Sequence, residues 1–148
     1  MTEPVPTRCD FNAEDLEVEL DLTFPGTISA IGPVVERVMG TVGQMACAQG
    51  KEHQIEVALY EALANAVRHG CNEDPSCEVQ VSVACDPARG LLIVVRDPGP
   101  GFDPASLPSP VEAENLMRAH GRGVFLINQL MDEVRFERGG TEIWMHKK

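Results

Sequence analysis

Basic residues are scarce in this sequence: 12 Lys and Arg stand against 23 Asp and Glu, which gives a formal net charge of −11 and a pI near 4.7. Broad binding to DNA or RNA needs cationic surface that displaces counterions, so the composition argues against a nucleic-acid partner. The same charge disfavours an anionic membrane surface. A small anionic ligand stays compatible with it, because helix N-termini and a bound cation reverse the sign of the field locally.

Long apolar runs are also lacking. No stretch approaches the length of a membrane-spanning helix, and the N-terminal "MTEPVPTRCDFNAEDLE" has neither the basic start nor the apolar core of a signal peptide. The 148 residues, 43% of them hydrophobic, suit one domain with a substantial core. We therefore expect a cytoplasmic protein without a membrane partner, in which residues 1–15 form a flexible tail and residues 16–148 form a single domain.

The cysteines show no metal-binding pattern. Five is an odd number, and none of the spacings is typical of zinc sites. Free thiols in a reducing compartment are the favoured interpretation, and a redox role for the pair around 71–77 is the alternative, for which the sequence offers no support. The five residues are Cys9, Cys47, Cys71, Cys77 and Cys85.

Hydrophobic periodicity predicts the secondary structure. Apolar residues alternate with polar ones over residues 16–24, which predicts a half-buried strand. Residues 77–86 and 91–95 read as a hairpin, and residues 133–146 read as two short strands around Gly139-Gly140. Helical spacing covers three segments, 27–49, 52–69 and 121–134, and a short helix is expected over 112–120.

This order of elements predicts an α+β protein: a two-layer α/β sandwich with a mostly antiparallel sheet covered on one face by helices. Gly40 and Gly43 weaken the first helix without clearly ending it, and residues 98–110 are a Gly- and Pro-rich loop. A strand followed by G-x-G-x-x-G and a helix is absent, and so is the Walker pattern. The chain therefore does not read as a Rossmann or P-loop nucleotide-binding unit.

One helix carries a polar stripe within "EALANAVRHG", residues 61–70. Glu61, Asn65 and His69 recur at four-residue steps and so lie on one helical face. Arg68 stands beside them. Glu61 and Asn65 lie on the flank of the apolar stripe, where the helix meets whatever it covers. A stripe of acid, amide and imidazole is either a solvated face or a site.

Two glycine-rich motifs follow. Asp97 ends an apolar strand in "RDPGPGFDP", where Gly99 and Gly101 would let a ligand approach the backbone; an ordinary Asp-Pro-Gly turn is the alternative. "GRGVF", residues 121–125, opens a helix whose free N–H groups suit a phosphate. Each motif taken alone is weak evidence for a site.

Together, and in this order, the three motifs resemble the ATPase fold shared by gyrase, a heat-shock chaperone, histidine kinases and mismatch-repair MutL, the Bergerat-type or GHKL fold. The resemblance covers about residues 16–146. "EALANAVRHG", "DPGPGFDP" and "GRGVFLINQLMDEVRFERGGTEI" are most similar to bacterial anti-sigma-factor serine/threonine kinases. Neither a further DNA-binding or transducer domain nor a phosphoacceptor-histidine helix pair is seen, which argues against a gyrase subunit, a MutL subunit and an intact sensor kinase.

The resemblance implies ATP and Mg²⁺ as cofactors. It makes Asn65 the Mg²⁺ ligand, Asp97 the acceptor for the adenine amine, and residues 121–123 phosphate binders, with an ATP lid at about 103–120. His69 either holds the phosphate side or caps the helix end, and Arg122 either contacts the triphosphate or lies in solvent. Pro100 stiffens the glycine turn. The implied nucleotide-binding set is Asn65, Arg68, His69, Asp97, Gly99, Gly101, Phe102, Gly121, Arg122, Gly123, Val124 and Thr141.

Glu61 is the candidate catalytic residue for transfer of a phosphoryl group from ATP. A carboxylate one turn from Asn65 is placed to deprotonate an attacking hydroxyl as a general base, which gives an ATPase with water and a kinase with a partner's Ser or Thr. The resemblance implies a Mg²⁺·ATP-dependent serine/threonine kinase that binds a sigma factor, phosphorylates a small STAS-type antagonist, and forms a homodimer. The alternatives are a nucleotide-dependent sequestering module with little or no kinase activity, and a detached histidine-kinase catalytic domain.

Overall fold

A computed structural model describes residues 17–86, 88–99 and 123–148 of the chain. The expected tail at 1–15, the lid at about 103–120 and the helix at 112–120 lie outside the described residues. So do four residues of the implied nucleotide-binding set: Gly101, Phe102, Gly121 and Arg122.

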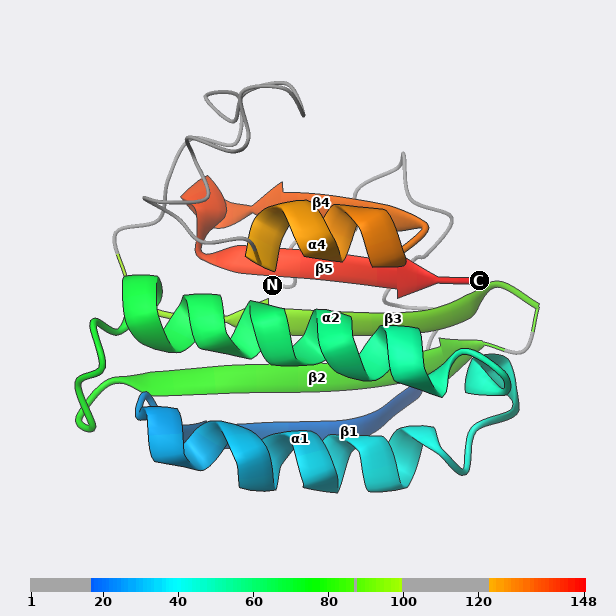
Figure 1. The fold of residues 1–148 in the computed structure, drawn as a ribbon, viewed down its shortest axis with the longest axis horizontal. Coiled ribbons are helices and arrows are strands. Elements are labelled where there is room, and N and C mark those ends of the chain that lie inside the picture. The colour runs from blue at the N-terminus through cyan, green and yellow to red at the C-terminus, as the bar shows by residue number, and fades with distance from the viewer. Residues whose placement is uncertain (1–16, 87, 100–122) are drawn as a thin grey trace.

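The centre of the molecule is a five-stranded sheet in the order β1-β2-β3-β5-β4 (Figure 1). Each neighbouring pair is antiparallel, so the prediction of a mostly antiparallel sheet is confirmed. The strands are β1 (Glu17–Pro25), β2 (Glu78–Asp86), β3 (Gly90–Arg96), β4 (Glu133–Glu137) and β5 (Glu142–Lys147).

Three α-helices lie on one face of this sheet: α1 (Ile28–Val42), α2 (Glu52–Asn65) and α4 (Gly123–Leu130). Figure 1 shows α1 alongside β1, α2 across the middle strands, and α4 over β5 and β4, and α2 packs against both other helices. Three short turns complete the helical structure: η2 (Ala46–Ala48), the π-helical η3 (Ala66–Gly70) and η5 (Arg138–Gly140). The predicted two-layer α/β sandwich is confirmed.

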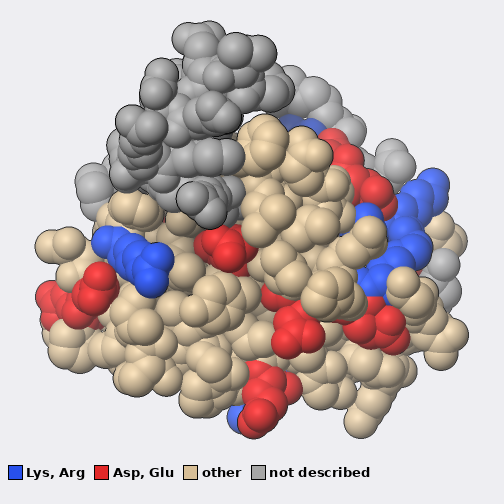
Figure 2. Space-filling model, in the orientation of Figure 1, with Lys and Arg blue, Asp and Glu red and all other residues tan. Residues whose placement is uncertain are grey.

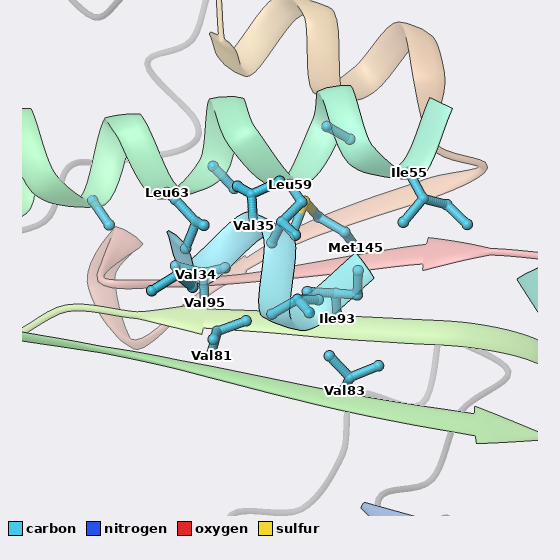
Figure 3. Packing of buried hydrophobic residues seen from close by; sticks show 14 of the residues in the cluster. Val34, Val35, Ile55, Leu59, Leu63, Val81, Val83, Ile93, Val95 and Met145 are labelled. Carbon is cyan, nitrogen blue, oxygen red and sulfur yellow. The ribbon is translucent and has the colours of Figure 1, made fainter. Parts of the chain in front are cut away.

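The core lies between the helices and the sheet (Figure 3). Alternate residues of the strands, such as Val81, Val83 and Ile93, point toward the helices, as a period of two requires. Ile55 and Leu59 of α2 meet them and are fully buried. Each such side chain contributes about 1.5–3 kcal/mol by leaving water, so this layer fixes the position of α2 on the sheet.

Two predicted helices end earlier than expected. The helix over 27–49 stops at Val42, with Gly43 as its C-cap, and residues 46–48 form a separate 3₁₀ turn. The helix over 121–134 stops at Leu130, because Asp132 donates its backbone N–H to His146 and the chain joins the sheet at Glu133. Backbone pairing with β5 therefore overrides the helical spacing of Val134, which lies in β4.

Four cysteines form two disulfides in the structure. Cys47 is bonded to Cys85, and Cys71 is bonded to Cys77. The prediction of free thiols is wrong for these four residues, because the fold brings together cysteines that the sequence separates by 38 and by 6 positions.

The surface agrees with the acidic composition. On the face shown in Figure 2, acidic side chains are scattered, and Lys and Arg gather mainly at the right-hand edge. Within the described residues, the helices are too short or too polar to cross a membrane.

Candidate functional site

One end of the sheet collects the predicted motifs. In Figure 1, α2 ends, β3 ends and α4 begins at the left-hand side of the molecule, where η5 also leads into β5. The chain order alone separates these segments by tens of residues. The antiparallel packing of α2 against α4 is what brings them to the same edge.

Two glycines make the closest contact in this region. A Cβ placed on Gly70 would lie 2.2 Å from the Asp97 carboxyl carbon, and a Cβ on Gly99 would lie 2.1 Å from the Gly70 carbonyl oxygen. No side chain fits at either distance, so only glycine allows the end of η3 to rest on the Asp97–Gly99 turn. This contact joins the helix that bears Glu61 and Asn65 to the strand that ends in Asp97.

Asp97 is anchored at its backbone and at one carboxylate oxygen. Its N–H donates to the Thr141 carbonyl at 2.9 Å, and its Oδ1 accepts the Gly99 N–H at 2.8 Å. Desolvation raises the pKa of the Asp97 carboxyl above its usual value, against the opposing effect of the Gly99 hydrogen bond. Within the described part of the chain, Oδ2 accepts no hydrogen bond, so a half-buried acceptor remains for a ligand donor.

Thr141 lies next to Asp97, as a shared site requires. Its carbonyl receives the Asp97 N–H at 2.9 Å, and its hydroxyl donates to the Arg138 carbonyl at 2.8 Å. The η5 turn that precedes it contains Arg138 at φ 54 and Gly140 at φ 90. These left-handed residues turn the chain sharply, so that β5 starts beside the end of β3.

Sequence reasoning missed an ion pair that fixes this junction. Arg96 and Glu142 are cross-strand partners in β3 and β5, and the Arg96 guanidinium donates to the Glu142 carboxylate. Glu142 is only 3% exposed and also accepts the Trp144 indole N–H at 2.6 Å. Arg96 immediately precedes Asp97, and Glu142 immediately follows Thr141. The adjacency of "RD" and "TE" in the sequence is the only signal, and it becomes meaningful only once the register is known.

Glu61 and Asn65 occupy the last turn of α2. Both are half-buried, as expected of residues on the flank of the apolar stripe. In the region that the structure describes, their side chains form no hydrogen bond or ion pair. Neither side chain has a buried polar atom without a partner, so both are open to water or to a ligand.

The helix changes its winding directly after Asn65. Residues 66–70 form a π-helical turn, closed by the Cys71 N–H on the Ala66 carbonyl at 2.8 Å. The added residue per turn takes His69 off the regular four-residue spacing from Asn65. Arg68 and His69 are exposed. Single π-turns of this kind often occur at functional sites, and this one delivers Gly70 to Asp97.

The predicted phosphate-binding helix is described from Gly123 onward. Gly123 is the first residue of α4, and that helix packs against α2. The side chain of Val124 lies outside the described part, as do residues 121–122. What the structure places is the start of α4, on the same side of the molecule as the end of α2 (Figure 1).

The described residues contain no group of three His, Cys, Asp or Glu side chains suited to hold a metal. Mg²⁺ bound with a nucleotide needs few protein ligands, because phosphate oxygens and water fill most of its octahedral shell. A single half-buried amide oxygen, that of Asn65, fits this donor set.

Comparison with known proteins gives one family. A family model described as the histidine kinase-like ATPase domain matches residues 24–147. The chain is 27% identical to the serine-protein kinase RsbW of Oceanobacillus iheyensis over 135 residues, 86% of this chain and 85% of that protein. It is likewise 27% identical to RsbW of Bacillus subtilis, over 86% and 84% of the two chains.

A second type of relative carries a different name. The anti-sigma F factor of Geobacillus thermodenitrificans is 34% identical over 101 residues, which are 64% of this chain and 67% of that protein. The family match spans Glu61, Asn65, Asp97 and Thr141, and the observed sandwich is the Bergerat-type fold that the motifs resemble. The chain therefore belongs to the histidine kinase-like ATPase domain family.

Proposed function

We propose that the protein is a Mg²⁺·ATP-dependent serine/threonine protein kinase that acts as an anti-sigma factor in partner switching. The observation that carries the proposal is the contact of Gly70 with Asp97 and Gly99, which sets a half-buried acceptor at the end of the helix bearing Glu61 and Asn65. The names of the relatives, serine-protein kinase and anti-sigma F factor, support the two halves of the proposal.

Asp97 recognises the base in this proposal. Its Oδ1 is held by the Gly99 N–H, so Oδ2 accepts the adenine amine directly or through water. Gly99, Gly101 and Phe102 are assigned to the same subsite, in which glycine has no side chain to block the approach of a ring. Thr141 completes this subsite through its contact with the Asp97 backbone.

Asn65 and the start of α4 serve the triphosphate. The Asn65 amide oxygen is the one protein ligand that we assign to Mg²⁺, which neutralises charge on the phosphates. Gly121, Arg122, Gly123 and Val124 offer backbone N–H groups and a guanidinium to the phosphates. Arg68 and His69, which follow Asn65 closely in the sequence, are assigned to the phosphate side, and residues of about 103–120 are assigned to the ATP lid.

Glu61 is the proposed general base. It takes the proton from the hydroxyl of a partner's Ser or Thr as that oxygen attacks the γ-phosphorus, while ADP keeps the electrons of the broken P–O bond. A carboxylate at this position has no purpose in a module that only binds nucleotide. The half-buried, unpartnered state of Glu61 in the described structure suits this role.

The name of one relative, anti-sigma F factor, supports a sigma factor as a protein partner. One state of the protein holds a sigma factor, and in the other it phosphorylates and releases a small STAS-type antagonist, both in the cytoplasm. We also propose a homodimer as the working unit. The net charge of −11 supports protein partners over nucleic acid.

Glu61→Gln tests the kinase against the sequestering alternative. The antagonist is first captured from the source cells on the wild-type protein with Mg²⁺·ATP and identified by mass spectrometry. With that antagonist, Glu61→Gln should still bind ATP and both protein partners, while phosphorylation falls by ~10²–10⁴-fold. The variant would then be an inhibitor that can no longer inactivate its antagonist.

The control is Glu56→Gln, an exposed position of the same helix, which should phosphorylate at the wild-type rate. A Glu61→Gln rate within a few-fold of wild type refutes the base assignment. Negligible phosphorylation by the wild type, with partner binding intact, favours the sequestering module. Acid-labile phosphate on the partner would instead identify a histidine-kinase catalytic domain.

A further inference from the structure

The Cys71–Cys77 bridge adjoins Gly70 at the edge of the proposed nucleotide site. Cys71 follows Gly70, the residue on which Asp97 and Gly99 rest, and Cys77 precedes β2. The two Cα atoms are 5.5 Å apart, within the range that a disulfide spans. The bridge therefore closes a short loop whose first residue adjoins the site.

The enclosed loop adopts a conformation that needs support. Asn72 and Glu73 both have left-handed φ angles, 53 and 56, which are uncommon for residues other than glycine. Hydrogen bonds from the Glu73 N–H to the Val67 carbonyl at 2.8 Å and from the Cys77 N–H to the Asp74 carbonyl at 3.0 Å help to hold it. The covalent bridge across the loop adds the remaining constraint.

The Cys71 sulfur has little room to move. A Cβ on Gly26 would lie 2.7 Å from the Cys71 Sγ, so the backbone at the end of β1 presses against this side chain, which is 4% exposed. The Gly26 N–H also donates to the Cys77 carbonyl at 2.7 Å. Crowding at Cys71 therefore favours movement of the loop when the two sulfurs separate, and Cys77, which is half-buried, is the less buried of the pair.

We propose that Cys71 and Cys77 form a reversible redox site that controls nucleotide affinity, an inference that rests on the proposed function. The reagent class is a low-molecular-weight disulfide. The Cys77 thiolate attacks it and expels one thiol, and the Cys71 thiolate then attacks the Cys77 sulfur of the mixed disulfide and expels the second. The protein loses two protons and two electrons, and one external disulfide becomes two thiols.

The bridge stabilises the binding-competent arrangement. With the loop closed, Gly70 is held against Asp97 and Gly99. With the loop open, that contact competes with relaxation of the left-handed pair, Asn72 and Glu73. Reduction should therefore weaken ADP binding by about fivefold or more, the lower range of measured couplings between sites.

The second disulfide supplies a matched control. Cys85 lies near the other end of β2, opposite Leu91, and its bond reaches Cys47 in η2. Neither residue adjoins Asp97. Opening this bridge should leave ADP affinity unchanged.

The test uses the full chain with Cys9, Cys47 and Cys85 replaced by Ser, so that one pair remains. It is oxidised with glutathione disulfide or reduced with dithiothreitol, and alkylation with mass spectrometry reports the bond. Mg²⁺·ADP affinity is measured by calorimetry, with far-UV circular dichroism as a check of the fold. A folded, reduced form that binds ADP about fivefold or more weakly supports the proposal.

Equal affinity in the two verified states overturns the proposal and leaves the proposed function intact. Failure of the bridge to form, tighter binding by the reduced form, or weaker binding that comes with global unfolding overturns it as well. No ADP binding in either state overturns both the redox coupling and the nucleotide site. The Cys9→Ser, Cys71→Ser, Cys77→Ser variant, which keeps only the second bridge, should bind ADP equally with that bridge open or closed.

Discussion

At one end of the sheet the polar groups are paired with one another, and at the other end several are held in place without a partner in the described chain. The first, the Asp86 end, is where β2 turns into β3. There Arg89 pairs with Asp86 at 2.7 Å, His146 Nε2 contacts the Arg89 carbonyl at 2.7 Å, and the Lys148 N–H donates to Asp132 at 2.6 Å. Each of these groups has a partner within the described residues.

The second, the Asp97 end, is where β3 ends beside the last turn of α2. Burial raises the pKa of the Asp97 carboxyl, whereas the Ala88 N–H and the Arg89 side chain hold the pKa of the Asp86 carboxyl below its usual value. Asp86 ends β2 and Asp97 follows β3, the two strands of one hairpin, and the pKa values of their carboxyls are shifted in opposite directions. A half-buried carboxylate with a raised pKa is typical of functional sites, so the contrast agrees with the proposal that the Asp97 end binds the ligand.

After Glu61→Gln, the largest effect is expected from substitution of Gly99 at the Asp97 end, with Gly90 at the Asp86 end as its comparison. Gly99→Ala would set a methyl group 2.1 Å from the Gly70 carbonyl and should abolish measurable ADP binding, with about 1–3 kcal/mol lost from the free energy of unfolding. Gly90→Ala would meet the Lys147 carbonyl at 2.4 Å, at φ 107, and should cost similar stability but keep ADP affinity.

Calorimetry with Mg²⁺·ADP measures the nucleotide affinity, and urea unfolding measures the free energy of unfolding. The control is Gly40→Ala, where a Cβ meets nothing within 4 Å and helix propensity predicts that the free energy of unfolding rises by about 0.5–1 kcal/mol. Retained ADP binding in Gly99→Ala would show that the close contact does not shape the site.

Asp97→Asn separates binding from stability. Loss of the carboxylate acceptor should weaken ATP and ADP alike by ~1–3 kcal/mol and reduce the preference for adenine over guanine. The same change should stabilise the nucleotide-free protein at neutral pH, because it removes a desolvated charge. Asp86→Asn should instead lower stability and leave nucleotide affinity unchanged. Thermal unfolding and calorimetry of the two variants decide the matter, and unaltered ATP affinity in a folded Asp97→Asn would remove Asp97 from the site.

The changes in unfolding free energy caused by Asp97→Asn and Asp86→Asn should have opposite signs at neutral pH, and both should shrink in acid. The raised folded-state pKa of Asp97 means that its contribution to stability is fully present below the unfolded value, about 3.9, and is lost as pH rises through the folded value. The gain from Asp97→Asn should therefore be largest at neutral pH and shrink toward pH 4. For Asp86, whose pKa is lowered, stability is lost as pH falls through the folded value, so the cost of Asp86→Asn shrinks only in stronger acid. Denaturant unfolding of both variants between pH 4 and pH 7 measures the trend, and a gain from Asp97→Asn that does not change over this range contradicts it.

Asn65→Ala should have the smallest effect. It should remove most of the tightening of ATP binding by Mg²⁺ while leaving Mg²⁺-free affinity nearly unchanged, because the amide oxygen is the one protein ligand proposed for the ion. Titration of ATP with Mg²⁺ or with EDTA tests this. Gln54→Ala, an exposed position on the same helix, is the control, and a wild-type response of Asn65→Ala to Mg²⁺ would place the metal elsewhere.

The strands could be predicted because their apolar residues alternate without interruption. The pattern over 16–24 gives β1 within one residue at each end, and the continuous run at 91–95 gives the buried β3. Helix ends were harder to predict, since β5 captures the chain after Leu130 and thereby ends α4. Competition between a helix and a sheet for the same backbone groups depends on tertiary position and has no local signal.

The candidate site likewise combines residues that local motifs predict with contacts that only the fold creates. The motif makes Asp97 and Gly99 candidates, but nothing in "RHGCN" indicates that Gly70 rests on the Asp97 carboxylate 27 positions later in the chain. The Arg96–Glu142 pair and the two disulfides likewise depend on register and packing. Residue type and spacing locate candidate chemistry, whereas the distances that assemble it come from the fold.

The indole that donates to Glu142 gives the molecule a built-in optical reporter. Trp144 is the only tryptophan in the chain, it is 8% exposed, and it is held at 2.6 Å by the carboxylate that also pairs with the arginine next to Asp97. A rearrangement at the end of β3 that moves Glu142 changes the electric field around this indole. We expect ligand binding beside Asp97 and opening of the 71–77 loop to be visible in real time, in unlabelled protein, in the colour and lifetime of the tryptophan emission.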